Sequence, residues 1–174
     1  MKNIFLIIIF CLVLGFEAFS QTQREQEVID EINLVRTNPQ GYIQYIDPFL
    51  EYWGSGKEEI AAAEELKKEL KNMKPLPAME FSETLYTSSK KHGEYIRKTK
   101  RFEHSDCDCA ENIQYGNSDI RYAVLDLLVD GGVASRGHRR NILSPSHKYV
   151  GVYEVLGSVE DMPFIFVQQF TSGE

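Results

Sequence analysis

The sequence predicts an α+β domain in which helices pack on a small sheet. Apolar residues recur at helical spacing through the first three quarters of the chain, and the pattern changes to strand alternation from Tyr149 onward. The chain has 174 residues, of which 43% are hydrophobic, so it is long enough to bury a substantial core. We find no internal repeat and no linker, and we assign residues 21–174 to a single domain.

The first twenty residues have the pattern of a signal peptide. Lys2 precedes an apolar run from Ile4 to Gly15, and the small residues Ala18 and Ser20 occupy the −3 and −1 positions of a cleavage site. The run is short for a membrane span, and an uncleaved N-terminal anchor is the alternative. We therefore expect cleavage after Ser20, export from the cytoplasm, and a mature chain without a transmembrane segment.

Helices are expected along most of the mature chain. A capping box, Thr22 to Glu25, starts the first helix, which Asn38-Pro39 ends. Pro39 then opens a short, mostly buried segment. Further helices with one apolar face are expected over residues 58–73, from Ser82 to about 98, and from Asn117-Ser118 to Gly131-Gly132.

The end of the chain predicts an antiparallel hairpin. Residues 149–156 and 163–171 have strand character, and the second strand is apolar on both sides, which is typical of a central strand. The segment 99–117, by contrast, is expected to be irregular. A loop of this length inside a compact domain is usually functional.

Two stretches carry the candidate site residues. His104 and Glu111 lie in the segment 99–117, and His138 lies in Gly137–Leu143. Two imidazole nitrogens and one carboxylate oxygen suit zinc, with a fourth position open to water. The alternative is a structural role, in which these groups satisfy neighbouring backbone. The net charge of −7 argues against a nucleic-acid partner.

Cys107 and Cys109 are the two cysteines of the mature chain and form a Cys-Asp-Cys sequence. In an oxidising compartment they could pair in a disulfide, which at this spacing closes a small ring. Two free thiols are the equal alternative. Zinc ligation is disfavoured, because zinc sites prefer two to four residues between cysteines.

Five motifs in order resemble the CAP superfamily of cysteine-rich secretory proteins, antigen 5 and pathogenesis-related proteins. The resemblance covers nearly all of residues 24–171, and Ile32–Pro39 with Lys74–Pro77 resemble its bacterial-type branch. The five motifs are Phe102-Glu103-His104-Ser105, Ala110–Gly116, Gly137–Leu143, Val150-Gly151-Val152 and Phe166–Phe170.

The resemblance implies a three-layer α-β-α sandwich with a central cleft lined by two histidines and two acidic residues. Carried over, the histidines are His104 and His138, and the first acid is Glu111. Asp126 and Asp130 are the candidates for the second acid, because both lie on the predicted helix that precedes His138. Asp130 is equally explained as the last residue of that helix.

We therefore expect a secreted protein that binds a divalent metal, zinc in particular, or a small ligand in this cleft. A lipid- or sterol-binding module is the first alternative, with a groove formed by Tyr42, Tyr45, Phe49 and Trp53. A secreted peptidase or cell-wall hydrolase is the second. Ser105 next to His104 is its candidate nucleophile, but no Gly-x-Ser-x-Gly or His-Glu-x-x-His motif supports it, and we assign no catalytic residue.

Overall fold

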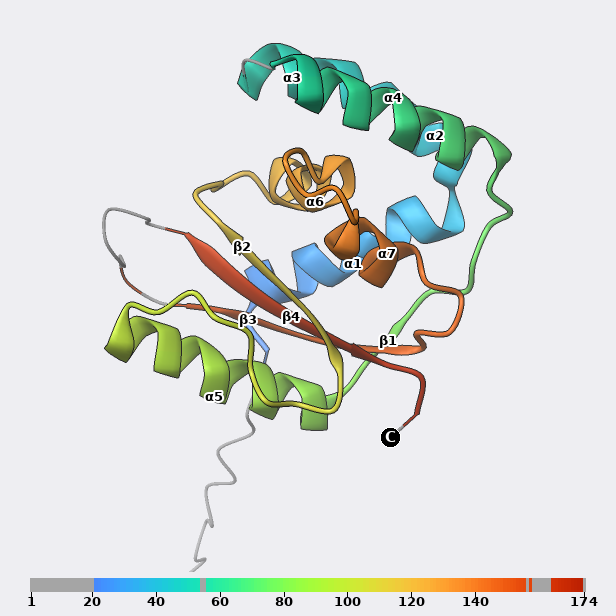
Figure 1. The fold of residues 1–174 in the computed structure, drawn as a ribbon. Helices are drawn as coiled ribbons and strands as arrows, with labels where there is room; N and C mark the ends of the chain where they lie inside the picture. Colours follow the sequence, from blue (N-terminus) through green and yellow to red (C-terminus); the bar gives the residue numbers. More distant parts are fainter. Residues whose placement is uncertain (1–20, 54–55, 156, 158–163, 174) are drawn as a thin grey trace, which may run out of the picture.

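A four-stranded mixed sheet lies between helices in the computed structural model, which describes residues 21–53, 56–155, 157 and 164–173 (Figure 1). The strand order is β1–β3–β4–β2. Strand β1 (Glu80–Phe81) is parallel to β3 (Tyr149–Glu154), and β4 (Ile165–Thr171) is antiparallel to both β3 and β2 (Ala110–Tyr115). The α+β prediction is confirmed, and β4 is central because its buried side chains need cover on both faces.

The helices form layers on both faces of the sheet. Helix α5 (Glu83–Thr99) covers one face, and α1 (Gln23–Thr37), α6 (Ile120–Val129) and α7 (Gly137–Leu143) lie on the other (Figure 1). Beyond them lies an outer group of helices. It comprises α2 (Pro39–Tyr42), the 3₁₀ helix η1 (Ile43–Tyr45), α3 (Ile46–Trp53) and α4 (Lys57–Asn72).

Local sequence signals set several of these boundaries. Thr22 accepts a hydrogen bond from the backbone of Glu25, whose side chain accepts one from Thr22 in return, so the predicted capping box starts α1. Asn38 ends α1 and caps α2, where Pro39 occupies the first position. Helix α6 is capped by Asp119, the residue directly after the predicted Asn117-Ser118.

The sheet separates two hydrophobic cores, because successive strand residues point to opposite faces. Val150, Val152, Phe166 and Phe170 face the core built with α1 and α6. The other core lies under α5 and contains Tyr86, Ile96, Tyr153, Val155, Ile165 and Val167.

Helix α5 crosses the sheet closely at Gly151 of β3. A Cβ atom at this position would lie 2.3 Å from the backbone nitrogen of Tyr86, so only glycine allows the approach. The buried hydroxyl of Ser89 donates a hydrogen bond to the Gly151 carbonyl across the same contact. The small residues on the inner face of α5 thus place this helix directly over the centre of the sheet.

Arg36 is buried in the last turn of α1, with 1% of its surface exposed. Its guanidinium donates hydrogen bonds to the carbonyls of Pro77, Ile142, Ser144 and His147 at 2.8–3.1 Å. These acceptors lie in the segments that lead into β1, end α7 and lead into β3. One side chain therefore joins α1 to three segments that are distant in sequence.

The prediction that residues 99–117 are irregular is wrong for their second half. Residues 110–115 form β2, which pairs along its whole length with β4. Glu111, Asn112 and Gln114 are polar but buried, so the strand lacks the apolar alternation that would have indicated it. The two-residue strand β1 and the short helix α7 were also not predicted from the sequence.

The predicted signal peptide lies outside the residues that the structure describes. Among the helices of the described ranges, none combines the length and the apolar character that crossing a membrane requires.

Replacing Arg36 with methionine is expected to lower the free energy of unfolding by about 3 kcal/mol, because four carbonyls lose a charged donor in a buried setting. Urea denaturation at neutral pH measures the loss. Arg97 is the matched control, since it is also in the last turn of a helix but is half-exposed and pairs with Glu94 at the surface. Its replacement should change stability by less than about 0.5 kcal/mol, and equal losses in both variants would contradict the role of Arg36.

Candidate functional site

The carboxylate of Glu111 on β2 is the centre of the first part of the site. Only 4% of this side chain is exposed. Oε1 lies 2.9 Å from Nδ1 of His104 and accepts a hydrogen bond from the backbone of Ser105, and Oε2 accepts from the Ser105 hydroxyl at 2.6 Å and from Gln169 Nε2 at 2.8 Å. Because a carboxylate accepts, Nδ1 of His104 carries its hydrogen toward Glu111.

Four donors hold Glu111 in its ionised form. Burial raises the pKa of Glu111, but the hydrogen bonds from the Ser105 hydroxyl, Gln169, the Ser105 backbone and His104 outweigh that effect. The pKa of Glu111 is therefore lower than its ordinary value. The carboxylate stays negative at neutral pH and orients the His104 ring, whose side chain is 63% exposed.

His92 on α5 extends this cluster. Its Nε2 donates a hydrogen bond to the Glu103 carbonyl at 2.8 Å and lies 3.8 Å from Oε1 of Glu111. The ring is 8% exposed and stacks on Tyr95 at 5.8 Å. His92 is thus a buried histidine that lies against the site.

Asp130 and His138 form the second part of the site on the other side of β2. Asp130 ends α6 in the left-handed conformation, with φ 55°, and only 2% of its side chain is exposed. Oδ2 accepts a hydrogen bond from the His138 backbone at 3.0 Å, and Oδ1 lies 2.7 Å from His138 Nδ1. The same carboxylate thus satisfies a backbone donor at the start of α7 and orients the His138 ring.

The edge strand β2 connects the two parts. Glu111 and its neighbour Asn112 point to opposite faces of the sheet. The amide of Asn112 lies 3.4 Å from the His138 carbonyl, and Asn141 of α7 donates to the Glu111 carbonyl at 3.3 Å and to Asn112 Oδ1 at 2.9 Å. Helix α7 is therefore attached to the strand that carries Glu111.

Asp130, and not Asp126, is the partner of His138. Asp126 lies one turn earlier on α6 and interacts with Gln114. Burial raises the pKa of Asp126, an effect that Gln114 and His138 partly offset. Asp126 lines a different pocket, together with residues of α3 and α4.

Two arginines close to His138 in sequence, Arg136 and Arg139, have structural partners. Arg136 pairs with Glu58 and Glu65 of α4 at 2.8 and 3.0 Å. Arg139 is 3% exposed and donates to backbone carbonyls of α4 and α6.

Potential nucleophiles near His104 are engaged elsewhere. The Ser105 hydroxyl donates to Glu111 and accepts from Gln169 at 3.1 Å, so its proton points to a carboxylate and not to an imidazole. Cys107 and Cys109 are joined in a disulfide, one of the two alternatives that the sequence left open.

The aromatic residues Tyr42 and Phe49 are buried in the core.

A groove of about 670 Å³ opens beside His104, between α5 and the loop before β2. Lys91, His92 and Tyr95 line it from α5, and His104 and Cys107 line it from the loop. This volume is within the range of sites that hold small ligands.

The geometry suits metal binding by the imidazoles better than by the carboxylates. Within the part of the chain that the structure describes, no hydrogen bond reaches Nε2 of His104 or His138, and no three His, Cys, Asp or Glu side chains form a ready-made metal site. With Nδ1–H directed at a carboxylate, the lone pair of the neutral imidazole lies on Nε2. Glu111, expected from the sequence to supply an oxygen ligand, is already saturated with donors.

The histidines and acids of the site were predicted from the sequence, but the residues that hold them in position were not. Gln169 and Ser105 hold Glu111, and Asn112 with Asn141 joins β2 to α7. The pair Gln168-Gln169 inside an otherwise apolar central strand was the available signal, since buried polar side chains need partners.

These features define a sandwich of helices around a mixed sheet, with a histidine–carboxylate pair on each side of its edge strand. The chain belongs to the cysteine-rich secretory protein (CAP) family, whose model matches residues 29–170.

Two solved structures are similar. An outer surface protein from Borrelia burgdorferi is 17% identical with a TM-score of 0.46, over 69% of this chain and 96% of that one. NaASP2, in a crystal structure with Zn²⁺, is 13% identical with a TM-score of 0.53, over 90% of this chain and 84% of that one. Identities this low show the fold alone. A search of curated proteins finds no match.

Because the folded pKa of Glu111 is lowered, ionised Glu111 should stabilise the fold fully above its unfolded pKa of about 4.3. This contribution is lost as the pH falls through the lower folded pKa. Urea denaturation between pH 7 and pH 3 should show that Glu111→Gln is less stable than the wild type at pH 7 and that the difference shrinks toward pH 3.

The exposed Glu51 offers a control, because Glu51→Gln removes the same charge from a solvated position. Its stability should follow the wild type at each pH. A difference between Glu111→Gln and the wild type that does not depend on pH would refute the inferred ionisation of Glu111.

Proposed function

We propose that this protein is an exported CAP-domain protein, with one domain over residues 21–174, that binds a divalent cation through Nε2 of His104 and His138. Zinc is the best match, because two neutral imidazoles are ligands that it prefers. The pairing of each Nδ1 with a buried carboxylate is the observation on which this proposal rests.

That pairing is the arrangement by which proteins prepare zinc-binding histidines. A carboxylate that accepts from one ring nitrogen fixes the tautomer and the ring orientation, and it makes the other nitrogen a stronger ligand. His104 and His138 both have it, with distances of 2.9 and 2.7 Å. Glu111 and Asp130 are thus proposed as orienting groups, not as ligands.

Two protein ligands leave coordination positions open. When bound, zinc would supply a Lewis acid that attracts water or an anionic or carbonyl group of a ligand. The groove beside His104 offers space for such a ligand. The crystal structure of the similar protein NaASP2 with Zn²⁺ is consistent with zinc as the ion.

Export is proposed from the N-terminal pattern of Lys2, the apolar run to Gly15 and the small residues before Gln21. The family description as secretory is consistent with it. An oxidising compartment also suits a disulfide between Cys107 and Cys109.

Calorimetric titration with Zn²⁺ tests the site without assuming an activity. We expect the variants His104→Ala and His138→Ala each to weaken binding by at least about tenfold, and Glu111→Gln to weaken it by about 10- to 100-fold through loss of ring orientation. Unchanged zinc affinity in the double variant His104→Ala/His138→Ala would refute the proposal.

His147 provides the control, because its Nδ1 bonds to the Asn141 carbonyl and its ring stacks on Phe170, away from both carboxylates. His147→Gln removes an imidazole without touching either pair, so it should bind zinc as the wild type does. Circular dichroism on each variant confirms that it is folded.

A further inference from the structure

A second pocket lies between the outer helices and α6, and the proposed zinc site does not use it. Its volume is about 440 Å³, within the range of sites for small molecules. Helix α3 contributes Phe49, Leu50 and Trp53, the start of α4 contributes Glu59, and α6 contributes Asp126 and Val129.

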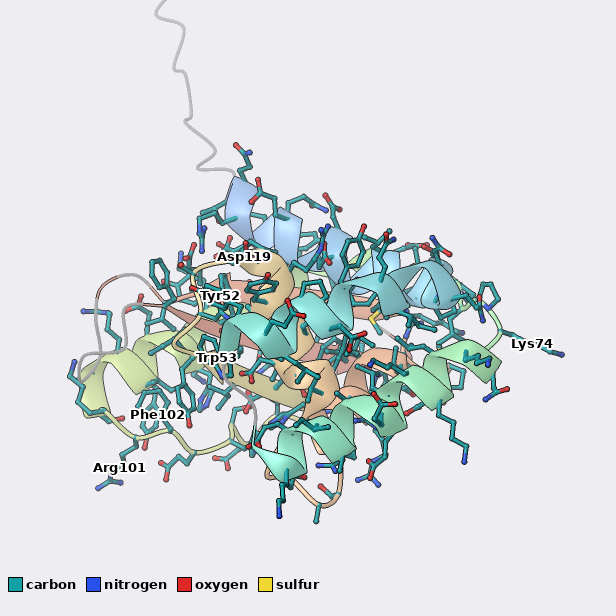
Figure 2. All side chains as sticks on the ribbon, turned by 90° about the horizontal axis from the view of Figure 1, so that it is seen from above. Tyr52, Trp53, Lys74, Arg101, Phe102 and Asp119 are labelled. Atoms are coloured by element: carbon teal, nitrogen blue, oxygen red, sulfur yellow. A yellow bond between two sulfur atoms is a disulfide. The ribbon has the colours of Figure 1, made fainter. Side chains whose placement is uncertain are left out.

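One wall of this pocket is aromatic and partly open to solvent. The rings of Phe49 and Trp53 are stacked with centroids 6.3 Å apart, and Tyr52 stacks on Trp53 at 6.2 Å. Trp53 is 45% exposed and Tyr52 is 68% exposed, and Figure 2 shows both at the end of α3. Tyr122 of α6 supports the wall through contacts with Phe49 and Tyr52.

The polar side chains of the pocket are both acidic. Among the described residues, no lysine or arginine pairs with Asp126 or Glu59, and none lines the pocket. Neighbouring acids are paired: Glu58 and Glu65 bind Arg136. A carboxylate that is partly removed from water is favoured by a cationic partner, and the half-buried Asp126 and Glu59 lack one among the described residues, whereas Glu58 and Glu65 have Arg136.

The surroundings hold these two acids in place. A Cβ atom at Gly131 would lie 2.9 Å from Glu59 Cγ, so the glycine makes room for the Glu59 side chain at the pocket. Asp126 interacts with Gln114, which is 1% exposed and whose Oε1 has no hydrogen-bond partner among the described residues. The hydrogen bond from Gln114 lowers the pKa of Asp126 against the effect of burial and holds the Asp126 carboxyl in position.

We propose that this pocket binds a small organic cation, in which an ammonium group is carried by an aromatic or other apolar body. Asp126 is the main counter-ion at the inner end, and Glu59 is the second. Trp53 and Phe49 pack on the apolar body, and their ring faces attract the positive charge. Because this site uses neither His104 nor His138, it does not depend on zinc binding.

The intrinsic fluorescence of Trp53 offers a direct readout, because it is the only tryptophan in the chain. The probe is 2-phenylethylamine, compared with 2-phenylethanol, its neutral counterpart of nearly the same shape. We expect saturable changes in Trp53 fluorescence with the amine and binding of the alcohol that is at least about tenfold weaker. Equal binding of the two would overturn the proposal, and this comparison requires no variant.

Substitutions then locate the charge. Asp126→Asn should weaken amine binding by about tenfold or more, and Glu59→Gln should weaken it by less, because Asp126 is proposed as the main counter-ion and Glu59 as the second. Glu51→Gln is the matched control, since it removes an exposed acid from α3 outside the pocket and should bind the amine as the wild type does.

The double variant His104→Ala/His138→Ala separates this proposal from the zinc proposal, because it should keep its affinity for the amine. If Asp126→Asn and Glu59→Gln both bind the amine with wild-type affinity, the fluorescence change comes from a neutral aromatic site or from the surface. This result would overturn the cation site. If Asp126→Asn does not fold, the amine–alcohol comparison and Glu59→Gln decide the question.

Discussion

The buried guanidinium of Arg36 is the contact on which most of the architecture depends. Its four carbonyl acceptors lie in the segments that lead into β1, end α7 and lead into β3. One of these segments ends α7, the helix that carries His138, so the position of the site follows from a contact in the last turn of α1. Arg139 acts similarly between α7, α6 and α4. Two charged side chains, each solvated by backbone carbonyls, therefore join the helical layers where apolar packing alone has no directionality.

The edge strand β2 combines stability and chemistry by alternating its side chains across the sheet. Glu111 faces the α5 side with Gln169, while Asn112 faces α7 with Gln168. Polar residues at these positions are tolerated because the register of β2 and β4 brings a glutamine opposite each of them. Replacing Glu111 or Asn112 with an apolar residue would remove a hydrogen-bond partner from Gln169 or Gln168, respectively.

Local signals predicted the helices well, because caps and breakers such as the Thr22–Glu25 box and Asn38-Pro39 act over a few residues. Strand β2 was missed because its polar residues are paired by β4, more than fifty positions later, and single-sequence patterns contain no such register. The resemblance to known proteins supplied His104, Glu111 and His138. It could not decide between Asp126 and Asp130, since that choice depends on the left-handed turn at the end of α6.

Asp130 shows how closely helix termination and site chemistry are coupled here. Its backbone adopts φ 55°, where glycine would fit with less strain, while its carboxylate receives both the α7 backbone and the His138 ring. Glycine, which suits this turn best, would leave the His138 ring without a carboxylate partner. Glutamate, which is longer by one methylene, would need a different backbone position to reach the same ring. A substitution of Asp130 at the end of α6 would therefore also change the orientation of His138 and the hydrogen bonding at the start of α7.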